Sequence, residues 1–180
     1  LPEEEKKIFR HMMAQEGTDE QYIKALRFLS ECLYKFHGKK TIILIDEYDV
    51  PLESAYTGGY YDEMVRYIRS FFETGLKTNP YLEFAVVTGC LRISKESIFT
   101  GMNNLRMVSV LSTQYDEYFG FTDDEVQEIC EFFGLVDKYQ KIKDWYNGYI
   151  FGNANVYNPW SVVYYMSCLV DNPDCFPESY

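Results

Sequence analysis

The chain has 180 residues, which suits one domain, or one domain with a small appendage, and allows a sizeable core. Its hydrophobic content of 47% excludes a disordered protein, and its net charge of −11 disfavours general nucleic-acid binding, because a phosphate-backbone binder is normally basic. No apolar run is long enough for a membrane span, and the charged start is not a signal peptide. Because the chain begins at Leu1 and not at Met, we expect it to be part of a longer protein.

Five cysteines are spread along the chain without a CxxC pair, and only two histidines accompany them. A zinc site is therefore disfavoured. We expect reduced, mostly buried thiols in a cytoplasmic protein. The cysteines are Cys32, Cys90, Cys130, Cys168 and Cys175.

The N-terminal part of the chain is predicted to be helical. Residues 3–15 have a helical pattern, and Gly17 ends it. Residues 18–21, Thr-Asp-Glu-Gln, have the form of a capping box that opens a second helix, which we expect to continue to Gly38.

The next stretch, residues 41–51, reads TIILIDEYDVP. Its continuous run of β-branched and aliphatic residues predicts a strand over 41–46 that is buried on both faces. The strand ends in Asp46 and Glu47, and open α/β sheets bind ligands at the carboxyl ends of their strands. This arrangement is typical of a Walker B strand, and the alternative is a pair of solvated carboxylates at a strand exit.

A strand–helix–strand unit follows from this first strand. Turn residues predict a loop over 49–59, apolar spacing predicts a helix over 60–77, and FAVVT predicts a buried strand over 84–88. The two strands are expected to be parallel, with a right-handed crossover.

Two polar residues follow the second strand, on the sheet edge where Asp46 is expected. Thr88 could sense a γ-phosphate, and Arg92 could neutralise charge that develops in a transition state. The alternative for Arg92 is a surface arginine paired with Glu96.

The remaining residues predict one strand, a hairpin and several helices. These are a strand over 106–111, a helix opened by a capping box at 122–125, a helix over 137–146, a hairpin over 148–157, and a helix from Asn158-Pro159 to about residue 170.

The sequence contains no Walker A loop, GxxxxGK[ST], whose glycine amides and lysine hold phosphates. Its single Gly-Lys pair is Gly38-Lys39, with Leu33 in place of the first glycine and Lys40 in place of Ser or Thr. This pair also precedes a strand, whereas a phosphate cradle follows one.

Five motifs follow one another along the chain: IILIDEYDVPL (42–52), FAVVTGCLRISKESIFTGMNNL (84–105), YFGFTDDEV (118–126), WYNGYIFG (145–152) and VYNPWSVV (156–163). In this order they closely resemble the AAA-ATPase-like family. Its members are bacterial and archaeal P-loop NTPases of the STAND-like type, often followed by a PD-(D/E)xK nuclease-like domain. The resemblance extends from about residue 20 to about residue 170.

The resemblance implies ATP and Mg²⁺ as cofactors. Asp46 and Glu47 would be the Walker B pair, with Asp46 as metal ligand and Glu47 as the residue that activates water. Asp49 would belong to the same motif. Thr88 and the catalytic Arg92 would lie in the sensor region.

The resemblance also implies an α/β fold, a parallel-sheet P-loop NTPase core over 1–112 with a small helical lid over 113–180. Pro159 would lie in that lid beside the nucleotide, and packing of aromatics around it is the alternative. Family members carry the P-loop upstream of the point where this sequence starts, so the core would lack its first strands.

In the implied sheet order 5-1-4-3-2, residues 41–46, 84–88 and 106–111 would be strands 3, 4 and 5. The position of strand 1 would be empty, and unpaired strand edges promote association. We therefore expect 106–111 to be displaced or completed by another chain.

We therefore expect the chain to be part of an ATP-binding and ATP-hydrolysing protein, and to carry its Walker B and sensor motifs. The chain alone would bind nucleotide weakly or not at all, and would associate with neither membrane nor nucleic acid. The alternative is a non-catalytic interaction module, which would use exposed aromatics such as Tyr60, Tyr164 and Tyr165 to contact a partner or its own missing segment.

Overall fold

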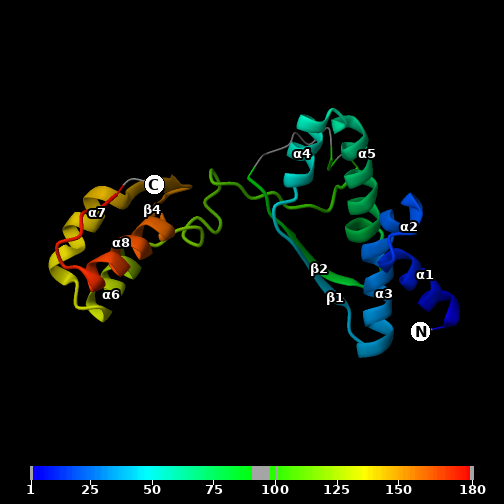
Figure 1. The fold of residues 1–180 in the computed structure, drawn as a ribbon, viewed down its shortest axis with the longest axis horizontal. Helices are drawn as coiled ribbons and strands as arrows, with labels where there is room; N and C mark the ends of the chain where they lie inside the picture. Colours follow the sequence, from blue (N-terminus) through cyan, green and yellow to red (C-terminus); the bar gives the residue numbers. More distant parts are fainter. Residues whose placement is uncertain (1, 91–97, 100, 179–180) are drawn as a thin grey trace. The chain divides into compact units, whose positions relative to one another are not determined.

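A computed structural model describes residues 2–90, 98–99 and 101–178 of the chain (Figure 1). The chain divides into two compact units, Leu1–Leu105 and Arg106–Tyr180. The first contains a parallel sheet with helices, and the second contains helices and a hairpin. Within the described residues, we find no helix with the length and apolar character needed to cross a membrane.

The first unit begins with the helices α1 (Glu3–Met13), α2 (Asp19–Ile23) and α3 (Ala25–His37). The predicted capping box is confirmed, because the Thr18 side chain accepts a hydrogen bond from the Gln21 N–H and the Gln21 side chain accepts one from the Thr18 N–H. The single helix predicted from this box to Gly38 is divided in two, with Lys24 between the parts.

The predicted parallel pair of strands is confirmed: β1 (Thr41–Ile45) lies beside β2 (Leu82–Val87). The crossover between them contains α4 (Val50–Gly58), α5 (Tyr61–Phe72) and the π-helix η1 (Glu73–Lys77). The sheet therefore has the strand–helix–strand order expected of an α/β protein.

The loop predicted over 49–59 is wrong, because α4 occupies most of it. Its turn-forming residues are located at the helix ends: Pro51 lies in the first turn, and Gly59 caps the C-terminus with a φ of 79°. Leu52 and Ala55 are fully buried, so the helix is stabilised by its packing on the core.

The expectation that β1 is buried on both faces is also wrong. Ile43 and Ile45 pack against the buried core of the unit, which is formed mainly by α4, α5 and η1. On the other face Ile42 is 63% exposed and Leu44 is 73% exposed. The two-stranded sheet is therefore covered on one side only by the described part of its unit.

Residues 106–111 form no strand, which corrects the prediction of a third strand there. A strand needs a neighbour to complete its hydrogen bonds, and this segment turns back instead, with the Ser112 N–H donating to the Ser109 carbonyl at 2.8 Å. The Val110 carbonyl accepts a hydrogen bond from the Gly152 N–H at 2.8 Å, so the segment packs on a hairpin turn.

The second unit contains the predicted helices and hairpin. The hairpin and two local signals are confirmed: the capping box between Thr122 and Glu125, and the hydrogen bond from the Ser161 N–H to the Asn158 side chain. The elements are α6 (Asp123–Phe132), η2 (Val136–Lys138), α7 (Tyr139–Tyr146), β3 (Asn147–Phe151), β4 (Ala154–Tyr157) and α8 (Pro159–Asp171).

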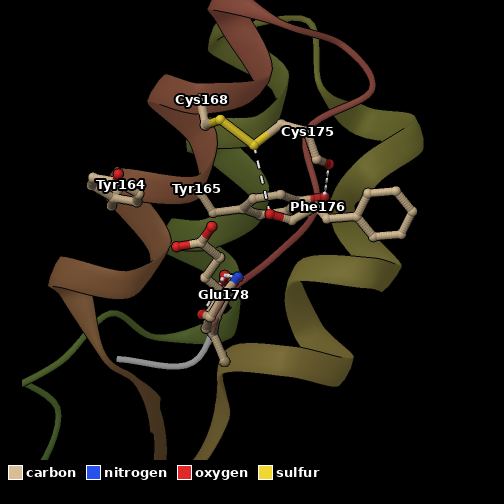
Figure 2. A pocket seen from close by; sticks show the side chains of 7 residues that line it. Tyr164, Tyr165, Cys168, Cys175, Phe176 and Glu178 are labelled. Atoms are coloured by element: carbon tan, nitrogen blue, oxygen red, sulfur yellow. Dashed lines mark hydrogen bonds between the residues drawn. A yellow bond between two sulfur atoms is a disulfide. The ribbon is translucent and has the colours of Figure 1, made fainter.

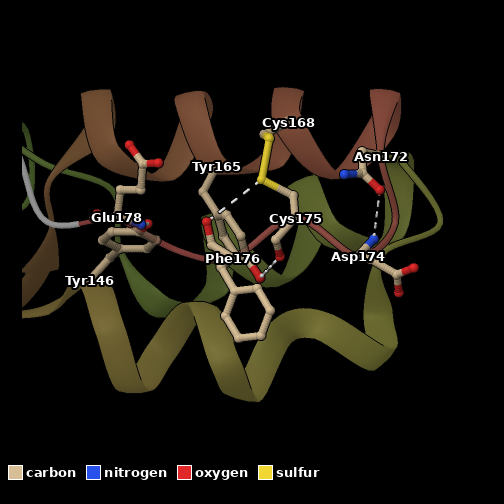
Figure 3. Close-up of a disulfide and its surroundings, with 8 residues drawn as sticks. All are labelled: Tyr146, Tyr165, Cys168, Asn172, Asp174, Cys175, Phe176 and Glu178. Atoms are coloured by element: carbon tan, nitrogen blue, oxygen red, sulfur yellow. Dashed lines mark hydrogen bonds between the residues drawn. A yellow bond between two sulfur atoms is a disulfide. The ribbon is translucent and has the colours of Figure 1, made fainter.

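The expectation of reduced thiols is wrong for two of the five cysteines. Cys168 near the end of α8 and Cys175 form a disulfide, with their Cα atoms 6.0 Å apart (Figure 3). The helix ends at Asp171 and the following turn brings the chain back onto it, so the two cysteines meet. The other three cysteines are free.

Candidate functional site

The carboxyl ends of β1 and β2 bring two of the predicted site residues side by side. The Thr88 N–H donates to the Ile45 carbonyl at 2.8 Å, and the Tyr48 N–H donates to the Thr88 carbonyl at 3.0 Å. These backbone bonds extend the parallel ladder beyond the last strand residues. Asp46 and Thr88 therefore leave the two strands at the same sheet edge.

The Asp46 carboxylate is held by two donors. The Thr88 hydroxyl and the Glu47 backbone N–H both donate to its Oδ1 atom, the latter at 3.0 Å. Among the described residues, no donor reaches Oδ2. One oxygen thus fixes the carboxylate, while the other is available to a ligand at an exposed edge.

Glu47 adopts an uncommon backbone conformation for a residue with a side chain, with a φ of 52°. This left-handed conformation costs roughly 1–2 kcal/mol. The Val50 N–H donates to the Glu47 carbonyl at 3.1 Å, closing the turn that leads into α4. Strain of this kind clusters at ligand sites, and here it belongs to the residue with the predicted catalytic role.

Asp49 occupies the position directly before α4 and is buried, with 5% of its surface exposed. Gly89 packs directly on it. A Cβ atom at Gly89 would lie 2.6 Å from Asp49 Oδ1 and 2.6 Å from Tyr48 Cε1, so no larger residue fits without movement. We did not identify Gly89 as a site residue from the sequence, although a glycine directly after a strand end is a usable signal.

The structure brings together four of the six predicted site residues: Asp46, Glu47, Asp49 and Thr88. Arg92 lies outside the described residues, as does Glu96, its alternative partner. Pro159 belongs to the second unit, where it occupies the first turn of α8.

The described residues contain no group of three or more His, Cys, Asp or Glu side chains that could hold a metal ion. Asp46 Oδ2 offers a single hard oxygen ligand at the sheet edge. Mg²⁺ is usually bound through one or two carboxylates together with water and substrate phosphates. The donor set therefore fits Mg²⁺ that arrives with a nucleotide, and does not fit a dedicated protein cage.

A small pocket lies elsewhere in the molecule, in the second unit (Figure 2). It is formed by side chains of α7, α8 and the segment that follows α8. Its lining residues are Tyr146, Tyr164, Tyr165, Cys168, Cys175, Phe176 and Glu178.

Two comparisons relate the chain to known proteins. A family described as Predicted AAA-ATPase matches residues 2–99. A protein of Azotobacter chroococcum mcd 1, described as an uncharacterized protein in the vnfD 5' region, is 32% identical over 129 residues, which cover 70% of this chain and 24% of the relative. The chain thus spans about a quarter of the length of this relative. No solved structure matches the chain.

Proposed function

The chain belongs to the AAA-ATPase-like family, and from this premise we propose that it is part of a P-loop protein that binds and hydrolyses ATP. One observation carries the proposal. Asp46 and Thr88, at the carboxyl ends of adjacent parallel strands, are hydrogen-bonded to each other beside the strained Glu47. Ligand sites of open α/β sheets lie at this edge.

Each residue at the edge has a proposed role. Asp46 Oδ2 would be a ligand of Mg²⁺, which supplies neutralisation of phosphate charge when bound. Glu47 would orient and deprotonate the attacking water. Thr88 would fix Asp46 through its hydroxyl, and Asp49, buried under Gly89, would hold the turn in place.

Arg92 and Pro159 complete the proposal. Arg92 follows the end of β2 by a few residues and would neutralise charge on the transferring phosphoryl group. Pro159 starts α8 and would belong to a lid over 113–180, in a protein whose ATPase core would include 1–112. The Asn158 side chain accepts a hydrogen bond from the Ser161 N–H and so caps the start of this helix.

The sheet supports an incomplete P-loop core. β1 and β2 are parallel neighbours, as strands 3 and 4 are in the order 5-1-4-3-2. A Walker A segment upstream of Leu1 would add the strand that carries the phosphate cradle. We also propose a cytoplasmic location, since ATP is a cytoplasmic substrate.

The proposal is tested by titrating ATP and Mg²⁺ into this chain and into a longer protein that includes the upstream segment. We expect the chain alone to bind weakly or not at all, and the longer protein to bind. Sub-micromolar binding by the chain alone would contradict an incomplete site.

An interaction module remains a second candidate, supported by the exposed apolar sheet face around Ile42 and Leu44. Three tyrosines were expected to be exposed. Tyr60 and Tyr164 are exposed, at 43% and 48%, but Tyr165 is only 2% exposed and belongs to the core. An in-frame GxxxxGK[ST] sequence upstream would favour the ATPase, and a stop codon there would favour the module.

A further inference from the structure

The segment after α8, residues 172–178, folds back along the helix, and we call it the strap. Its turn is closed by two hydrogen bonds to Asn172, from the Cys175 N–H to the backbone carbonyl at 2.9 Å and from the Asp174 N–H to Oδ1 at 3.1 Å. The disulfide from Cys175 to Cys168 ties the strap to α8, as Figure 3 shows.

Apart from this bond, the strap is held by noncovalent contacts: Pro177 is buried, and Cys175 packs against the core of the unit. The Tyr165 hydroxyl donates to the Cys175 carbonyl at 3.3 Å. Lys141 Nζ lies 4.4 Å from the centre of the Phe176 ring, but this ring is 77% exposed and contributes little apolar burial. The disulfide is the covalent tie between the strap and α8, and it acts alongside these contacts.

The strap covers two tyrosines whose hydroxyls it also engages. Tyr146 of α7 is 6% exposed and Tyr165 of α8 is 2% exposed. The Tyr146 hydroxyl shares hydrogen bonds of 3.1 Å with the backbone N–H and carbonyl of Glu178. Figure 2 shows both the strap and α8 lining this small pocket, with the disulfide at one end. Burial raises the pKa of both tyrosines above the usual value.

The two bonded cysteines are partly exposed to solvent. Cys168 and Cys175 are each half-buried, and most of the strap around Cys175 is exposed. Cys130 in the core of the same unit is 1% exposed, and burial raises the pKa of its thiol, so it is a poor competitor for exchange.

We propose that Cys168 and Cys175 form a thiol–disulfide exchange site, at which a dithiol reductant of the thioredoxin class opens the strap and uncovers Tyr146 and Tyr165. The inference does not depend on nucleotide binding. It assigns a redox modification site to the end of α8, on a unit whose remaining thiol is buried.

The exchange is balanced in two steps. A thiolate of the reductant attacks one sulfur, which forms a mixed disulfide and releases the other cysteine as a thiolate that takes up a proton. The second thiol of the reductant then displaces the remaining cysteine. Both cysteines end as thiols, and the dithiol ends as a disulfide.

The site is tested on the full 180-residue chain equilibrated in glutathione buffer of oxidising poise, then treated with dithiothreitol. Alkylation followed by mass spectrometry should find three reactive thiols under denaturing conditions before reduction and five after it, with a peptide linked through Cys168 and Cys175 only before. Amide hydrogen exchange over 172–178 should become about tenfold faster or more on reduction. Exchange in the first unit should not change.

Two variants control the experiment. Cys90→Ser removes an exposed free thiol and should leave the response to reduction intact. Cys168→Ser combined with Cys175→Ser should show fast exchange of the strap in both conditions. Five reactive thiols after oxidation would overturn the proposal, and so would strap exchange that reduction leaves unchanged; both measurements use the unmodified chain, so they decide even where the double variant does not fold.

Discussion

The hydroxyl of Thr88 donates its hydrogen bond to the Asp46 carboxylate. A side chain in this position was expected to sense a γ-phosphate, but the hydroxyl donates its hydrogen bond to Asp46 instead. In the proposed ATPase, Thr88 is therefore a positioning residue for the free oxygen of Asp46, since it fixes the carboxylate through Oδ1.

Replacement of Thr88 tests this role in a longer protein that carries the upstream segment. Thr88→Val keeps the shape of the side chain and removes a charge-assisted hydrogen bond of about 1.5–3 kcal/mol, so the Mg²⁺ concentration needed for half-maximal ATP hydrolysis should rise about tenfold. Thr88→Ser should restore it. An unchanged Mg²⁺ requirement in Thr88→Val would remove Thr88 from the metal site.

Part of the site could be predicted at the level of single residues. Parallel strands end at one sheet edge, so the sequence places Asp46 near Thr88 once both strands are recognised. It could not predict that Oδ1 takes both hydrogen bonds, or that Glu47 has a positive φ, because these depend on how the turn before α4 closes. The packing of Gly89 on Asp49 is likewise a tertiary contact, for which the sequence offers only the signal of a glycine at a strand end.

Among the elements, those with local signals were predicted well. Both capping boxes and the N-cap at Asn158 are formed as expected, since each needs only residues within one turn. The segment 106–111 was predicted as a strand from its residues and from the family resemblance, but a strand also requires a partner ladder. The helix α4 was missed because Pro51 and Gly59, which start and end it, are also turn residues.

The π-helix η1 depends on a buried amide. Asn79 Nδ2 donates to the Gly75 carbonyl and to Ser30 Oγ, both at 3.0 Å, and Asn79 Oδ1 accepts from the Tyr81 N–H at 3.1 Å. Asn79 is 8% exposed, so these bonds form away from water. The amide thereby joins η1 and α3 to the start of β2.

Asn79→Ala should lower the free energy of unfolding by about 1–3 kcal/mol, because the substitution leaves buried polar groups without their partner. Urea denaturation followed by circular dichroism measures the change. Asn103→Ala, at an exposed position, is the matched control and should stay within about 0.5 kcal/mol of the unmodified chain. Equal effects of the two substitutions would rule out a structural role for the Asn79 amide.

The start of α6 carries a carboxylate that stabilises the second unit in a pH-dependent way. Hydrogen bonds from Tyr157, and then from Tyr139 and Lys143, lower the pKa of Asp123 from 3.8 to about 2. Because the pKa of Asp123 is lower in the folded chain than in the unfolded chain, its carboxylate stabilises the fold at a pH above about 4. This contribution is lost as pH falls from about 4 to 2.

Unfolding measured between pH 4 and pH 2 should therefore show a steeper loss of stability in the unmodified chain than in Asp123→Asn. The neighbouring Asp124→Asn, at an exposed position, should follow the unmodified chain. If Asp123→Asn kept the full pH dependence in this window, other carboxylates would have to account for it.

At the scale of the whole molecule, the described residues cover one face of the sheet in the first unit. Ile42 and Leu44 on β1 and Phe84 and Val86 on β2 share one exposed face, with exposed fractions of 63%, 73%, 57% and 39%. Parallel sheets are normally covered on both faces. The sequence could not predict this exposure, because a continuous apolar strand looks the same whether or not the second layer belongs to the chain.

We expect the upstream segment of the longer protein to cover this face. Leu44→Asp should then change the stability of this chain by no more than about 0.5 kcal/mol, as for an ordinary surface position, while it lowers the melting temperature of the longer protein by several degrees. Lys39→Asp, at an exposed residue outside the face, is the charge-changing control. Equal effects of Leu44→Asp in both proteins would show that the face stays exposed.

The central claim is that the carboxyl end of β1 is part of an ATPase site, and Glu47→Gln tests it most directly. The variant is made in the longer protein, and ATP binding and steady-state hydrolysis are measured side by side. We predict that binding stays within about threefold while hydrolysis falls about 100-fold or more, because the amide cannot accept the proton of the attacking water. Hydrolysis at the unmodified rate would contradict the account.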